Sequence, residues 1–268
     1  MLACVAAQLA FVYGPTVAWL VDRWTMSVWH NAHGMLIPFL VAYFAYDELK
    51  RRPDLPIRAS AWGFLFFIPA IVLHVLDTGI HTQLLSAASI VLALPGLSLI
   101  FLGVERTKAI AFPLAFMVFM LPIPLAFTER IHLALRHVAT VASGHVSNAV
   151  GIPVYWEGTT IHLAHQTLFV GDACSGFSTL YAACAMAALT AYAAVGWKRR
   201  SLVLLSAVPL AIAANVVRVV LLVAVVHWQG IDVLSTWIHP ASGMLTFALA
   251  LPVILWLGSG GQRKQETA

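Results

Sequence analysis

The stretch Gly171-Asp172-Ala173-Cys174-Ser175-Gly176-Phe177-Ser178-Thr179-Leu180 stands where a polar segment becomes a long apolar run. A helix that begins near Ala173 would place Cys174 in its first turn, where unpaired backbone N–H groups and the positive end of the helix dipole stabilise a thiolate. Cysteine is also a small apolar residue that is common in packed helices, so a structural role competes with a nucleophilic one. Residues elsewhere in the chain are needed to distinguish the structural role of Cys174 from the nucleophilic one.

The composition of the chain is that of an integral membrane protein. Of its 268 residues, 61% are hydrophobic and 10% are charged, whereas about 25% of the residues of a soluble domain are charged. One globular core cannot hide so much apolar surface, which excludes an ordinary soluble domain. The net charge of +4 does not indicate nucleic-acid binding, because the Lys and Arg residues stand in short clusters between apolar runs.

Eight apolar stretches approach the roughly twenty residues that a membrane-spanning helix needs. They are residues 3–20, 34–49, 60–76, 84–103, 109–127, 173–195, 202–226 and 239–257. The sequence therefore predicts an all-α polytopic membrane protein, with residues 1–268 forming a single membrane domain. The start of the chain lacks a basic region and a cleavage site, so it is expected to be a retained first span. Cys4 and Cys184 lie inside apolar runs, and no disulfide framework is expected.

The basic residues predict the orientation of these spans. Eleven Lys and Arg residues fall in loops or termini of one side, three fall on the other side, and Arg218 lies within a span. Because cytoplasmic loops carry the excess of basic residues, both termini are predicted to be cytoplasmic. Cys174 and His239 then both lie at the outer ends of their helices. Because the spans were assigned from hydropathy alone, this agreement independently supports a common site that faces outward.

The one long segment on the outer side, about 128–172, has two parts. Its first half carries apolar residues at Ile131, Leu135, Val138, Ala142, Val146 and Ala149. This spacing predicts an amphipathic helix on the outer membrane surface. Its second half, 154–170, has β-branched and aromatic residues around a Gly turn, which predicts a small hairpin.

Two polar residues stand in apolar surroundings after Cys174. Arg218 closes the stretch Asn215-Val216-Val217-Arg218, and His239 opens the stretch His239-Pro240-Ala241-Ser242-Gly243. A Cys, an Arg and a His form a set suited to catalysis by a thiol. With the boxes A-C-S-G, N-x-x-R and H-x-x-S-G in this order, the sequence resembles the exosortase/archaeosortase family of membrane-embedded cysteine transpeptidases. Segments 33–38 and 151–158 also resemble family segments, so the resemblance covers nearly the whole chain.

Arg218 is costly within a span, at about 2.5–3.5 kcal/mol or more, so it should face a partner or a wet cavity. The residue alone leaves open a structural role in which it holds helices together. The resemblance implies instead that Arg218 stabilises an oxyanion, while Cys174 is the nucleophile and His239 transfers the proton. Asn215 could orient the guanidinium from the same helical face.

Two residues beside the cysteine are expected to support the site or bind substrate. Ser175 follows Cys174 directly, and Asp172 precedes it by two positions. Asp172 is expected to be a helix N-cap, although it could also orient His239 or bind substrate. Ser178 is not expected to be a serine nucleophile, because the G-x-S-x-G pattern is absent.

Eleven histidines compete for the role of base. His227 follows Arg218 by nine residues, about 180° around a helix, so the two cannot face one cleft. The outer segment carries five others, namely His132, His137, His145, His162 and His165. No pair among these five has the four-residue helical spacing of a zinc site, so neither a metal nor another cofactor is expected.

The resemblance implies a membrane cysteine protease or transpeptidase in a bacterial inner membrane, with its site facing the periplasm. Its implied substrates are exported proteins whose C-terminal sorting signal combines a Pro-Glu-Pro-type motif, one transmembrane helix and a basic tail. An amine acceptor on the surface of an exopolysaccharide-producing cell would complete the transfer. The alternative is a non-enzymatic transporter or assembly scaffold for a surface polymer, in which Arg218 binds an anion midway through the bilayer. Neither alternative involves nucleic acid.

Overall fold

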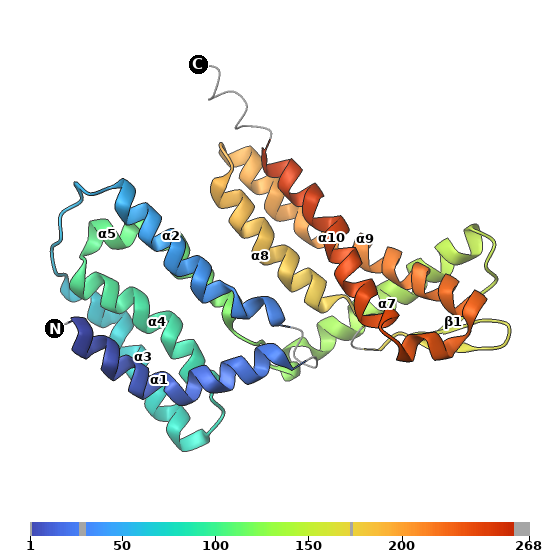
Figure 1. Ribbon diagram of the computed structural model, residues 1–268, viewed down its shortest axis with the longest axis horizontal. Coiled ribbons are helices and arrows are strands. Elements are labelled where there is room, and N and C mark those ends of the chain that lie inside the picture. Colours follow the sequence, from blue (N-terminus) through green and yellow to red (C-terminus); the bar gives the residue numbers. More distant parts are fainter. Residues whose placement is uncertain (1, 27–30, 172–173, 260–268) are drawn as a thin grey trace, which may run out of the picture. The chain divides into compact units, whose positions relative to one another are not determined.

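The computed structural model describes residues 2–26, 31–171 and 174–259 (Figure 1). It is 79% helical. Four of the described helical segments are long and apolar enough to cross a membrane: Ala61–Ile80, Leu84–Phe101, Trp197–Gln229 and Ala241–Ser259. They coincide with four of the predicted spans, so the all-helical membrane class is confirmed, while the count of eight spans stays a prediction.

The chain divides into two compact units, Met1–Ile123 and Pro124–Ala268. The first unit consists of α1 (Leu2–Thr25), η2 (Ala32–Met35), α2 (Ile37–Arg51), η3 (Ala61–Gly63), α3 (Phe64–Ile80), α4 (Leu84–Phe101), α5 (Val104–Ala109), α6 (Ala111–Phe116) and η4 (Met117–Met120). Its most extensive packing joins α3 and α4 (Figure 1). A Cβ on Gly63 would collide with the carbonyl oxygen of Gly96, so the absence of side chains at these positions lets the backbones approach closely.

The predicted span 109–127 is not one continuous helix. Helix α6 ends at Phe116, the short η4 continues to Met120, and α7 begins only at Leu125. Between them Leu121 is extended, with φ −72° and ψ 128°. Pro122 and Pro124 explain the break, because a proline lacks the N–H of the helical hydrogen bond and disfavours a helical conformation in the residue before it.

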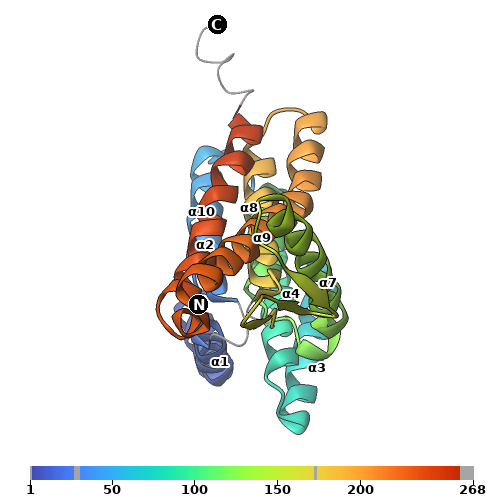
Figure 2. The same ribbon diagram turned by 90° about the vertical axis from the view of Figure 1, so that its right-hand side faces the viewer.

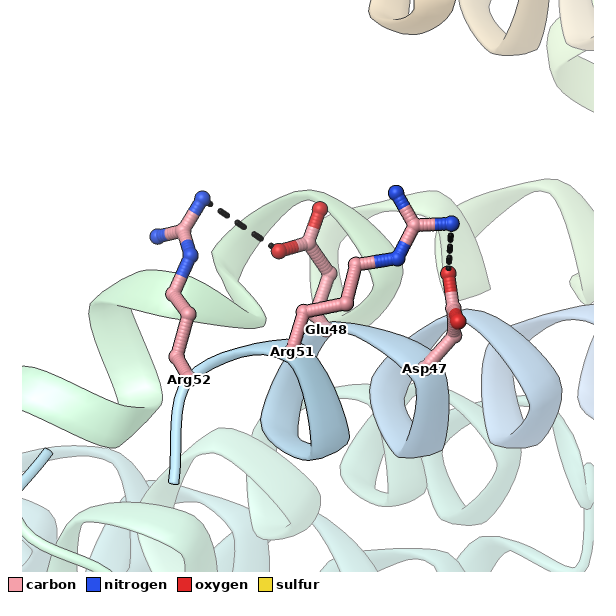
Figure 3. Close-up of polar contacts among 4 residues, drawn as sticks. All are labelled: Asp47, Glu48, Arg51 and Arg52. Atoms are coloured by element: carbon pink, nitrogen blue, oxygen red, sulfur yellow. Dashed lines mark ion pairs between the residues drawn. The ribbon is translucent and has the colours of Figure 1, made fainter. Parts of the chain in front are cut away.

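The C-terminal end of α2 carries part of the basic cluster that was used to predict the orientation. Arg51 Nη2 lies 2.8 Å from Asp47 Oδ2, and Arg52 Nη2 lies 3.3 Å from Glu48 Oε2 (Figure 3). Exposed pairs of this kind contribute about 0–1 kcal/mol, so their main significance is to mark a water-exposed helix end. Local acidic partners leave the prediction of orientation intact, because Asp and Glu contribute little to it.

The second unit consists of α7 (Leu125–Ala149), β1 (Tyr155–Glu157), β2 (Thr160–His162), β3 (Thr167–Phe169), α8 (Phe177–Ala193), α9 (Trp197–Gln229), η6 (Ile231–Ser235) and α10 (Ile238–Ser259). Helices α8, α9 and α10 pack against one another (Figures 1 and 2). Their shared core is rich in alanine, with Ala183, Ala187, Ala207 and Ala211 all buried. Small side chains allow the close helix contacts that are typical of membrane bundles.

The segment that is predicted to lie on the outer side forms a helix and a small sheet, as predicted. The sheet has one strand more than the predicted hairpin, with antiparallel order β1-β2-β3. Ile161 and Leu168 face each other in β2 and β3, and both are buried in a core that also contains Cys174 and Val223 of α9. The sheet and Cys174 therefore belong to one hydrophobic core.

Helix α7 turns its larger apolar residues outward. Ile131, Val138 and Val146 are between 42% and 45% exposed. The buried positions are instead small or polar: Thr128, His132, Ala139, Thr140, Ser143, Gly144 and Ser147. On this side Ser143 Oγ lies 3.3 Å from the carbonyl oxygen of Val216 on α9. The helix itself is confirmed, whereas its position on the outer membrane surface stays a prediction.

Candidate active site

Cys174 lies in the turn between β3 and α8, outside the spanning helices. Its backbone N–H donates to the carbonyl oxygen of Gly171 at 2.9 Å. Helix α8 begins only at Phe177, after Gly176 with a left-handed φ of 80°. Cys174 itself lies in a short 3-10 turn, so the predicted long helix begins at Phe177 and does not hold Cys174 in its first turn. The left-handed conformation at Gly176 delays the helix, because a right-handed helix cannot pass through it.

Asn215 of α9 holds this turn. Its Nδ2 donates to the carbonyl oxygen of Cys174 at 3.0 Å, in a buried position. A Cβ on Gly176 would lie only 2.5 Å from Asn215 Cγ. Glycine is thus needed at 176 both for the backbone conformation and for the close approach of Asn215. The A-C-S-G box and the N-x-x-R box are in direct contact.

Arg218 joins the second box to the third. It is only 4% exposed, and its Nε donates to Ser242 Oγ of α10 at 2.9 Å. A Cβ on Gly243 would lie 3.4 Å from the guanidinium carbon of Arg218. Ser242 and Gly243 are the last two residues of the H-x-x-S-G box, so the guanidinium lies on the small residues of that box.

Cys174 is buried, at 6% exposure, in a core that also contains Val219 and Leu222 of α9. Burial raises the pKa of this thiol above its usual value, while the positive charge of Arg218 opposes the rise. The net direction is upward, which contradicts the stabilised thiolate that a first-turn position predicted. A cysteine with a raised pKa is mainly a thiol at neutral pH, so Cys174 would need a base to take its proton if it served as a nucleophile.

His239 lies in the first turn of α10, three positions before Ser242 and four before Gly243. Positions three and four apart share one face of a helix, so position 239 is on the face of α10 that meets Arg218. The side chain of His239 and the whole of Asp172 lie outside the described residues. His227, the rival base, is exposed beside Trp228, whereas Arg218 is buried.

Ser175 has a partner that the sequence analysis did not identify. Its Oγ lies 3.0 Å from Nδ1 of His132, which is 3% exposed on α7. The ring of His132 also lies against Phe177, with 4.5 Å between the ring centroids. The signal for His132 was present in the sequence as a stripe of small and polar residues along 125–149, but His132 was considered there only as a possible metal ligand.

Comparison with known proteins identifies the family. Residues 24–256 match the family described as transmembrane exosortase (Exosortase_EpsH). Because the match covers most of the chain, this protein belongs to the transmembrane exosortase family, as the three boxes predicted. Membership in this family indicates a membrane transpeptidase. No curated protein and no solved structure matches the chain significantly.

Proposed function

We propose that this exosortase is a cysteine transpeptidase that cleaves C-terminal sorting signals of exported proteins at the outer face of the inner membrane. The observation that supports this most strongly is the direct contact among the three boxes. Asn215 binds the carbonyl oxygen of Cys174 at 3.0 Å, and Arg218 binds Ser242 at 2.9 Å. A nucleophile, a cation and a helix face that begins with a histidine therefore share one small region of the second unit.

The proposed reaction has two transfers. Cys174 Sγ attacks the carbonyl carbon of the scissile peptide bond, and His239 takes the thiol proton, which the raised pKa of the thiol makes necessary. The carbonyl oxygen becomes an oxyanion, which Arg218 stabilises. When the tetrahedral intermediate collapses, the C–N bond breaks, His239 returns the proton to the leaving amine, and a thioester remains on Cys174. An acceptor amine, or water, then attacks the thioester and releases the thiol.

The position of Arg218 along α9 favours a site at the membrane surface. Eighteen residues separate it from Arg200, in the basic cluster that is predicted to be cytoplasmic. A helix rises about 27 Å over that distance, close to the ~30 Å thickness of the hydrocarbon core. Arg218 is then expected near the outer boundary of the bilayer. A transporter that bound an anion midway through the bilayer would require Arg218 to lie deeper. With both termini cytoplasmic, the site faces the periplasm, where a substrate held by its transmembrane helix presents its cleavage motif.

The experiment is co-expression with an exported protein that carries a Pro-Glu-Pro motif, a transmembrane helix and a basic tail. We expect a truncated product with the wild type and with Cys184→Ala, and none with Cys174→Ala. Cys184 is a matched control because it lies in α8 and packs against the alanine-rich core. Undiminished processing by Cys174→Ala, at equal membrane levels, would exclude the proposed chemistry.

A further inference from the structure

His132 is a buried histidine to which the proposed reaction assigns no step. It lies on α7, and its Nδ1 is 3.0 Å from Ser175 Oγ. The imidazole also packs on Phe177, with an angle of 31° between the rings. His132 thus contacts the residue that follows the nucleophile and the first residue of α8.

The hydroxyl of Ser175 connects these contacts. The backbone N–H of Phe177, the first of α8, donates to Ser175 Oγ at 3.3 Å. A serine hydroxyl has one proton to donate and two lone pairs, so it can accept from Phe177 and still bond to either tautomer of His132. The bond therefore joins α7 to the start of α8 through the residue next to Cys174.

The turn that carries the thiol is consequently held from two helices. On one side Asn215 of α9 binds the carbonyl oxygen of Cys174. On the other side His132 of α7 binds the side chain of Ser175. The left-handed Gly176 follows, at φ 80°. Since the two bonds act on successive residues, loss of the second removes one of the contacts that orient the turn at Cys174.

We propose that His132 is a positioning residue, which acts through Ser175 to fix the direction of the Cys174 thiol. This inference rests on the proposed function of Cys174. Orientation matters because a nucleophile displaced by about 1 Å can lose about 10²-fold in rate. The buried bond between His132 and Ser175 keeps the sulfur on the line of attack, and His132 itself takes no proton from the substrate or the thiol.

The test is a double-mutant cycle on the rate of substrate processing. His132→Phe keeps an aromatic ring against Phe177 and removes the bond, whereas Ser175→Ala removes the other partner. Each change should slow processing about 10-fold to 100-fold. The double variant should be no slower than the slower single variant, because both changes remove the same interaction. His132→Asn, which offers an amide near the place of Nδ1, should recover most of the rate.

His137→Phe is the matched control, since it makes the same substitution at an exposed histidine of α7. It should process substrate at the wild-type rate. Losses that multiply in the double variant would show that His132 acts independently of Ser175, and they would overturn the proposal. Normal turnover by His132→Phe would overturn it too. If neither His132→Phe nor His132→Asn accumulated in the membrane, His132 would be a folding residue and the proposal would fail.

A second measurement separates this proposal from the proposed function. The rate at which iodoacetamide alkylates Cys174 depends on the position of the thiol and needs no substrate. We expect His132→Phe and Ser175→Ala to change this rate by the same factor of about 3 or more, with the rate in His137→Phe unchanged as the reference. If the wild type processed no substrate but the alkylation results held, the proposed function would fail while the positioning role stood. Unchanged alkylation of Cys174 would contradict the positioning role.

Discussion

Gly176 provides the sharpest test of how Cys174 is held. An alanine at this position would have to adopt φ 80°, which costs an L-residue with a Cβ about 1–2 kcal/mol. Its Cβ would also lie 2.5 Å from Asn215 Cγ, so Asn215 would have to move. That movement breaks the bond from Asn215 to the carbonyl oxygen of Cys174 and leaves buried polar groups unpaired, at a further cost of about 1–3 kcal/mol. Gly176→Ala should therefore lower the free energy of unfolding by about 2–5 kcal/mol.

Gly158 is a matched control for the backbone contribution. It too has a positive φ, 59°, but no atom lies within 4 Å of a Cβ built on it. Gly158→Ala should therefore lose only about 1–2 kcal/mol and should keep its activity. The assay is thermal unfolding of both purified variants in detergent, together with their rates of substrate processing. We expect Gly176→Ala to be the less stable variant and to process substrate at least about 10²-fold more slowly than wild type. Equal stability and activity of the two variants would refute the close packing of Asn215 on the turn.

Three further predictions concern charge, reactivity and topology. Arg218→Lys keeps a positive charge but lacks the Nε that binds Ser242 and the planar pair of donors, so turnover should fall about 10²–10³-fold at matched membrane levels; near-normal turnover would rule out the oxyanion role. Labelling by a small thiol reagent should be lost in Cys174→Ala and kept in Cys184→Ala. Because only the thiolate reacts and burial raises the pKa of Cys174, the labelling rate should rise with pH through a midpoint above the ordinary pKa of cysteine. A midpoint below that value would contradict the burial of the thiol. Alkaline phosphatase fused at Gly151 should be active and fused at the C-terminus inactive, and the reverse pattern would contradict the predicted topology.

Hydropathy predicted the helices of this protein better than it predicted their ends. The predicted spans 84–103 and 202–226 lie almost entirely on α4 and α9, because long apolar runs have few alternatives to a helix in a membrane. The ends depend on single residues. Pro122 and Pro124 interrupt the predicted span 109–127, and the left-handed Gly176 delays α8 to Phe177. An average over some twenty residues is insensitive to either effect.

The residues of the candidate site were likewise predicted only in part. The three boxes identified Cys174, Asn215 and Arg218, and these residues do share one region. His132 was not identified, because its burial depends on which side of α7 packs against α9. In water the apolar side of a helix is the buried one, but in a bilayer the lipid can cover that side and leave small and polar residues to pack. Sequence periodicity alone does not distinguish these two cases.

The central claim is that Cys174 forms a thioester with the substrate. The direct measurement is mass spectrometry of the enzyme trapped during processing, before and after treatment with hydroxylamine, which cleaves thioesters. The account predicts that the N-terminal part of the substrate is attached to the peptide that contains Cys174, that hydroxylamine releases it, and that Cys184→Ala retains the adduct. Substrate cleavage by Cys174→Ala, or an adduct on a residue other than Cys174, would contradict it.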